Sequence, residues 1–154
     1  MTTWRPGLLA CIMIGTGATT ALAADAPTVS DAWARATAPG VDVGAAYMVI
    51  EGGARDDRLV DASSDRAAMV HLHTVEEQDG VAKMRAIEAV PVPAGARVVL
   101  APKATHLMLM GLDRPLVVGE RFTVTLEFAQ SGPQAVAVGV KAATATDDHA
   151  HHQH

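Results

Sequence analysis

The chain has 154 residues, a formal net charge of −5 and 19% charged residues, a size that allows one domain with a hydrophobic core. Its acidic balance lacks the basic surface of nucleic-acid binders, and 3% aromatic residues leave few rings on which bases stack. We therefore expect no nucleic-acid partner.

Residues 1–23 have the pattern of a secretory signal peptide. Arg5 is the only charged residue before Asp25, an apolar run from Leu8 to Ile14 follows it, and Ala21 to Ala23 form a small-residue cleavage site. The segment is too short and too rich in glycine and threonine for a membrane-spanning helix. We expect cleavage after Ala23 and an exported protein that does not span the membrane.

Cys11 is the only cysteine of the chain. The residues Leu8 to Cys11 look like a lipoprotein cleavage box, but too few apolar residues precede Cys11 for a normal apolar region, so we expect no lipidation. With Cys11 removed, the mature protein has no thiol. This excludes disulfides, thiolate zinc sites and the blue-copper centre that a cupredoxin-type redox protein needs.

Residues 24–142 are expected to form one domain of short strands. Apolar or alternating runs are separated by Gly, Pro and Asp turns, which is typical of an antiparallel β-sandwich or barrel. The segment 57–70 has the best helical pattern, but its serines favour a loop, and Glu76 to Gly80 is expected to form an exposed hairpin turn. Strands are expected at 46–53, 67–75, 81–92, 96–102, 105–112, 120–130 and 135–142.

Residues 143–154 form a small, polar segment that ends in several histidines. It has too little apolar surface to pack, so we expect a disordered tail. A purification tag is usually an uninterrupted histidine run, whereas Ala150 and Gln153 interrupt this one, which favours a native metal-binding tail. Its candidate ligands are His149, His151, His152 and His154.

The segment 105–112 carries unusual residues at alternate positions. His106, Met108 and Met110 would share one face of a strand, while Leu107 and Leu109 would share the other. The first face is either a half-buried core face or part of a soft-metal site. Thioether ligands select Cu(I), and imidazole also suits copper, whereas two histidines with two methionines make a poor zinc site.

The spacing of these residues has the form H-x10-M-x21-H-x-M, from His73 through Met84 and His106 to Met108. This pattern resembles the PCu(A)C family of periplasmic copper chaperones, formerly DUF461. The segments "DAWARATAPG", "GAAYMVIEG", "GVAKMRAIEAVPVPAG" and "HLMLMGLDRPLVVGERFTVTLEF" are similar to that family in the same order. The resemblance extends from Val29 to about Val140.

The resemblance implies a cupredoxin-like β-sandwich with Greek-key topology, in which His73, Met84, His106 and Met108 bind Cu(I) as cargo. It also implies a chaperone, not an enzyme, that supplies copper for the dinuclear centre of cytochrome c oxidase. The expected partners are the copper-bearing oxidase subunit and Sco-type copper chaperones. In such proteins a His-rich tail is associated with Cu(II).

One position departs from the family pattern, because His71 stands where the family usually has an acidic residue. If His71 and His73 share a strand, His71 is a candidate fifth ligand, a partner of the ligands, or a link to the tail. Met110 is a further candidate ligand. Met48 and Met69 are assigned to the core or to the edge of the site. Packing roles are expected for Trp33, Arg35 and Tyr47.

Copper exchange with a partner requires a shallow site, so we expect little burial of the Met84 and Met108 sulfurs. Binding should weaken below about pH 6, because histidine ligands must be neutral. A second interpretation is a general periplasmic copper buffer that acts mainly through the tail. The expected state is a monomer or a weak copper-bridged oligomer.

Overall fold

The computed structural model describes residues 25–142, and within this range every regular element is a β-strand. None of these residues belongs to a helix long and apolar enough to cross a membrane. The ten strands are β1 (Thr28–Arg35), β2 (Val43–Glu51), β3 (Asp57–Ser64), β4 (Ala67–Gln78), β5 (Val81–Ala86), β6 (Val90–Val92), β7 (Arg97–Leu100), β8 (His106–Leu112), β9 (Arg121–Phe128) and β10 (Gly132–Lys141).

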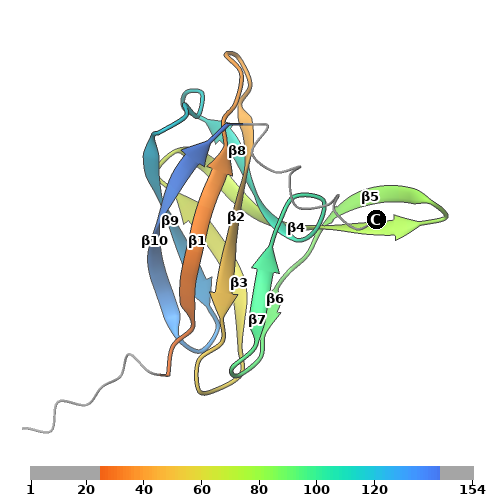
Figure 1. Cartoon of the computed structure of the whole chain (residues 1–154), viewed down its shortest axis with the longest axis vertical. Helices are drawn as coiled ribbons and strands as arrows, with labels where there is room; N and C mark the ends of the chain where they lie inside the picture. Colours follow the sequence, from red (N-terminus) through yellow and green to blue (C-terminus); the bar gives the residue numbers. More distant parts are fainter. Residues whose placement is uncertain (1–24, 143–154) are drawn as a thin grey trace, which may run out of the picture.

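The strands form one continuous sheet that folds over on itself into a sandwich (Figure 1). Its strand order is β5-β4-β8-β2-β1-β10-β9-β3-β6, and β7 also pairs with β2. The crossovers between non-consecutive strands, together with the all-β content, confirm the expected cupredoxin-like Greek-key sandwich. The strand pairs are antiparallel as expected, except that β1 and β10 run parallel and Trp33 pairs with Gly139.

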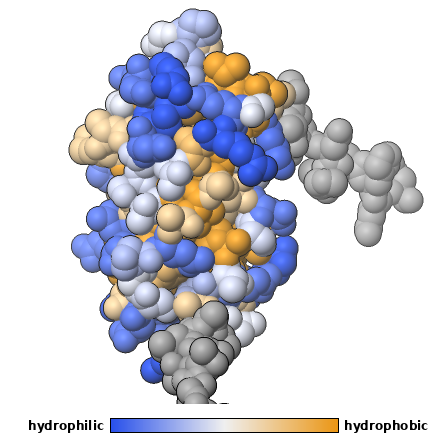
Figure 2. Space-filling model, turned by 90° about the vertical axis from the view of Figure 1, so that its left-hand side faces the viewer, coloured by the Kyte–Doolittle hydropathy of each residue, from blue (hydrophilic) through white to orange (hydrophobic). Residues whose placement is uncertain are grey.

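The core lies between the two layers of the sandwich and contains mainly Leu, Val, Ile and Phe. β9 shows how the sequence produces it, because Phe122, Val124, Leu126 and Phe128 are buried while the residues between them face outward. Figure 2 shows the side of the molecule with β9 and β10, where apolar residues reach the surface in a strip between polar ones. Alternation along β9 thus separates the core from the outer face.

Two strand predictions are wrong at particular residues. The segment expected to be a loop contains strand β3, whose register shifts between Leu59 and Asp61, so its buried residues lose the simple alternation. The segment expected as one strand, 81–92, is divided into β5 and β6 around Ile87. Ile87 turns back to the sandwich, where its N–H donates to the carbonyl of Leu72 at 2.9 Å.

The β4–β5 hairpin projects from the sandwich (Figure 1). β4 pairs with β8 from Ala67 to His73 and with β5 from His73 to Gln78, so His73 stands at the point where the strand leaves the sandwich. The turn at Asp79 and Gly80 has φ values of 55° and 74°, as two-residue hairpin turns require. The hairpin turn expected at Glu76 to Gly80 is therefore present.

Candidate metal centre

Strand register places two of the candidate ligands face to face. His73 on β4 lies directly opposite His106 on β8, and their ring centroids are 6.0 Å apart. Opposite residues of paired strands point to the same side of a sheet. The next pair, Leu72 with Leu107, points into the core. The two imidazoles therefore share the outer face of the sheet.

The two candidate methionine ligands lie on the same face. Met108 is two residues from His106, and Met84 pairs with Val75, which is two residues from His73. Met84, His106 and Met108 line one cavity of about 1290 Å³, bounded by the hairpin and by residues of β1, β2 and β8. His73 does not line this cavity and lies half-buried beside His106. The fold thus brings together candidate histidine and methionine ligands from the three strands β4, β5 and β8.

The ring of His106 has a fixed orientation. Its Nδ1 lies 2.9 Å from the carbonyl oxygen of Ala104, and since a carbonyl only accepts, Nδ1 carries the proton and donates. The side chain is almost fully buried, with 4% of its residue surface exposed. Nε2 then keeps its lone pair and is the atom that is able to bind a metal.

His73 has a different polar environment. Its Nδ1 is buried and has no hydrogen-bond partner within residues 25–142. Burial lowers the pKa of His73 below its ordinary value, and the neighbouring His106 and His71 lower it further. A neutral imidazole with an unsatisfied buried nitrogen is costly unless something binds it, and a metal ion would do so. The residue therefore fits a ligand better than a packing role.

The two methionines differ in exposure. Met84 lies on the projecting hairpin and is 51% exposed, whereas Met108 is half-buried between neighbouring strands. Every residue of β5 is exposed, so Met84 is not enclosed by core packing among the described residues. One ligand candidate is thus open to an incoming molecule while the others are shielded.

Imidazole and carboxylate groups alone do not complete a site here. Within residues 25–142, no three side chains of His, Cys, Asp or Glu come together in a way that would hold a metal ion. The side chains beside His73 and His106 that could add to such a centre are the methionines Met84 and Met108. Two neutral nitrogens with neutral sulfurs are suited to Cu(I), whose low charge needs little compensation.

Polar and aromatic residues surround the opening, and sequence reasoning gave two of them packing roles only. Arg35 and Tyr47 line the cavity with Lys103, and the Tyr47 ring lies 6.3 Å from His106 and 4.6 Å from Trp33. Burial raises the pKa of Tyr47, and the charge of Arg35 partly opposes this. The alternation of β2 places Tyr47 on the outer face, but only the pairing of β2 with β8 shows that this face carries the site.

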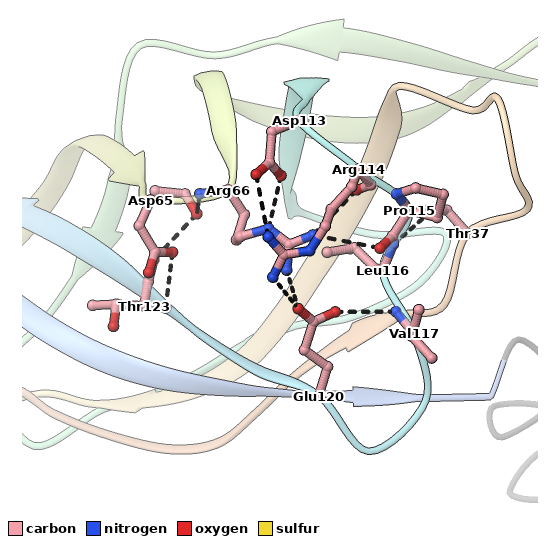
Figure 3. A network of polar contacts seen from close by, with 11 residues as sticks. Thr37, Asp65, Arg66, Asp113, Arg114, Pro115, Leu116, Val117, Glu120 and Thr123 are labelled. Atoms are coloured by element: carbon pink, nitrogen blue, oxygen red, sulfur yellow. Dashed lines mark hydrogen bonds and ion pairs between the residues drawn. The ribbon is translucent and has the colours of Figure 1, made fainter.

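A buried arginine, Arg66, holds the loop of residues 113–120 through a network of polar contacts (Figure 3). The Arg66 side chain is 6% exposed, donates from Nε to Asp113 at 2.8 Å, and forms an ion pair with Glu120. The hydrogen bond and charge of Asp113 raise the pKa of Arg66 against the opposing effect of burial. The same loop bonds to Thr37 through Leu116, and Thr37 lines the cavity.

The remaining candidates fall into three groups. Met48 is 1% exposed and belongs to the core. His71, Met69 and Met110 lie outside the cavity lining but on the outer face of β4 and β8, where His71 is opposite Met108. The tail histidines His149, His151, His152 and His154, and the expected signal peptide, lie outside the described residues.

The fold and the arrangement of the site define a domain of the PCuAC class. The structure is similar to a "Copper-bound PCuAC domain from PmoF2", with a TM-score of 0.64, 25% identity and coverage of 75% of this chain and 92% of the other. It is also similar to the Cu(I) form of DR1885 from Deinococcus radiodurans, with a TM-score of 0.60, 31% identity and coverage of 80% and 81%.

A family model described as "Putative lipoprotein LpqE-like" matches residues 27–140. A relative from Leifsonia xyli subsp. xyli, named "Putative lipoprotein Lxx21020", is 37% identical over 120 residues, which cover 77% of this chain and 71% of the relative. The chain therefore belongs to the LpqE-like family of PCuAC proteins, which confirms the resemblance seen in the sequence.

Proposed function

We propose that the protein is an exported copper chaperone that carries one Cu(I) ion as cargo between His73, Met84, His106 and Met108. The observation that carries this proposal is the register that sets His73 opposite His106 on the face that also holds both methionines. The copper named for the similar PmoF2 and DR1885 structures supports the choice of metal.

The four residues have different roles in holding and releasing copper. His106 offers Nε2 in a buried, fixed ring, and His73 offers a lone pair with no competing hydrogen bond. Met84 is the exposed ligand, so a partner's ligand is able to replace its sulfur first. Neutral thioethers bind Cu(I) without forming disulfides in an oxidising compartment. Binding and ligand exchange, without a catalysed reaction, are sufficient for this function.

The proposed location is the periplasm, and the proposed receiver is the copper-bearing subunit of cytochrome c oxidase, with Sco-type chaperones as co-workers. The lipoprotein names of the related proteins support export to the cell envelope. The exposure of Met84 supports a direct transfer, because an incoming partner is able to reach its sulfur first.

A Cu(I) titration of matched methionine variants tests the ligand set. We expect Met84→Leu and Met108→Leu each to weaken Cu(I) binding at least tenfold in competition with a chromophoric Cu(I) chelator. Copper-edge X-ray absorption should show fewer sulfur neighbours. Met48→Leu makes the same change in the core and should leave the affinity unchanged. Wild-type affinity in both site variants would refute the assignment.

A further inference from the structure

The candidate ligands of β4 and β8 do not end at the cavity. Three successive cross-strand pairs are formed entirely by histidine and methionine: His73 with His106, His71 with Met108, and Met69 with Met110. We call this arrangement the His/Met ladder. All six residues occupy alternate positions on their strands, so their side chains lie on one face of the sheet.

The outer part of the ladder is open to solvent. Met69 is 55% exposed, His71 is also exposed, and Met110 is half-buried. On the other side of β8, Ala45 is opposite Met108 and Val43 is opposite Met110, so no long side chain from β2 covers them. Core packing does not account for Met69, because more than half of its surface is exposed among the described residues.

The spacing of the ladder suits copper. Side chains directly opposite each other have Cβ atoms about 4.5–5.5 Å apart, within the span of two flexible methionines or a methionine and an imidazole that bind one ion. Successive cross-strand pairs of the ladder are about 7 Å apart, because this is the rise of two residues along a strand. One imidazole and two thioethers supply a three-ligand set of the soft kind that Cu(I) prefers.

We propose that Met69, His71 and Met110 form a second, weaker Cu(I) site that adjoins the chaperone site, an inference that rests on the proposed function. Met108 faces His71 and belongs to the first site, so it connects the two. Copper moves between them by ligand exchange, in which each new Cu–S or Cu–N bond replaces an existing one and the ion remains Cu(I). The second site would serve as the position at which copper enters or leaves.

Space for a copper-carrying molecule exists beside this second site. Met69 and His71 line a hollow of about 340 Å³ against Asp61 to Ser64 of β3. This hollow is separate from the large cavity that Met84 and His106 line. The second site therefore has an opening of its own beside the first site.

Methyl NMR of the mature chain, residues 24–154, labelled with methyl-¹³C methionine, tests this proposal during a Cu(I) titration past two equivalents. This chain has five methionines, and single Met→Leu variants assign their signals. We expect Met84 and Met108 to shift with the first equivalent and Met69 and Met110 with the second. Met48, 1% exposed in the core, is the internal control.

One variant separates the second site from the first. Met69→Leu should weaken the second Cu(I) at least tenfold while changing the affinity for the first by less than twofold. Met69 and Met110 signals that stay unmoved, or that move with the first equivalent, would refute the second site. Signals of Met84 and Met108 that stay unmoved would instead refute the proposed chaperone site, so the two failures are distinguishable.

Discussion

His73 and His106 are a pair of identical side chains with different constraints. The carbonyl of Ala104 fixes the tautomer of His106, whereas Nδ1 of His73 is buried without a partner among the described residues. The first histidine is therefore oriented before copper arrives, and the second gains a partner only when something binds it. At the scale of single residues, this difference makes His73 the histidine with a buried polar atom for a metal ion to satisfy.

The lowered pKa of His73 predicts a pH dependence of the free energy of unfolding. Since the unfolded chain has the ordinary histidine pKa of about 6.5, it takes up a proton at His73 at a higher pH than the folded protein does. As the pH falls below about 6.5, this residue therefore destabilises the copper-free fold. Above that pH it contributes nothing.

Denaturant unfolding of wild type and His73→Gln between pH 7.5 and 5 measures this contribution. We expect wild type to lose stability relative to the variant as the pH falls, because glutamine does not titrate. A constant difference between the two proteins over this range would contradict the lowered pKa.

At the scale of elements, the hairpin of β4 and β5 determines where Met84 stands. The turn requires positive φ at Asp79 and Gly80, and an ion pair between Arg85 and Glu76 links the strands at 2.5 Å. β5 is a fully exposed edge strand, so these local interactions replace the core packing that other strands have. The hairpin is thus the element best able to move when copper is exchanged.

Gly80→Val should weaken copper binding through the hairpin alone. A β-branched residue at φ 74° is strained, and we expect a loss of about 1 kcal/mol in the stability of the hairpin. Cu(I) affinity should fall several-fold, because Met84 is then less well positioned. Gly40→Val puts the same strain at φ 81° in a turn with no metal candidate beside it. Equal affinities of the two variants would argue against a positioning role for the hairpin.

The loop held by Arg66 is the second element linked to the site, because it bonds to Thr37 in the cavity lining. Arg66→Met removes a charge that is paired with Asp113 and Glu120, and these carboxylates reach solvent, so the cost is less than for a fully buried pair. We expect a loss of about 2 kcal/mol in the free energy of unfolding. Thermal unfolding measures it, and an unchanged Tm would show that the network adds no net stability.

At the scale of the whole molecule, the proposed copper binding is divided between the described domain and the C-terminal tail. We propose that the tail, residues 143–154, binds Cu(II) because of its composition, whereas the described domain holds the proposed His/Met site. The relative importance of these two parts distinguishes a chaperone from a copper buffer. A chaperone needs one selective copper site, whereas a buffer needs to bind many copper ions.

Removal of Asp147 to His154 tests this division. We expect the shortened protein to lose most of its Cu(II) capacity, measured by copper analysis after desalting, and to keep one tight Cu(I) ion. Replacement of the four tail histidines by asparagine, with the length unchanged, is the control for the loss of chain. Loss of the tight Cu(I) ion in either variant would favour the buffer interpretation.

The period-two pattern of apolar residues was sufficient to predict most strands, because it records directly which side chains face the core. It failed for β3, where a bulge between Leu59 and Asp61 interrupts the alternation, and for the break at Ile87 between β5 and β6. The pattern also did not predict the parallel pairing of β1 with β10, because local patterns carry no information about distant strand partners.

The sequence by itself determined the ligand chemistry, the candidate ligands and the family, because residue types and their spacing are local properties of the chain. Only the tertiary structure decided that His73 faces His106, that Tyr47 and Arg35 border the same cavity, and that the ladder continues to Met69 and Met110. The physical reason is strand register: a shift by one residue would turn the histidines into the core, and register is set by packing across the whole sheet.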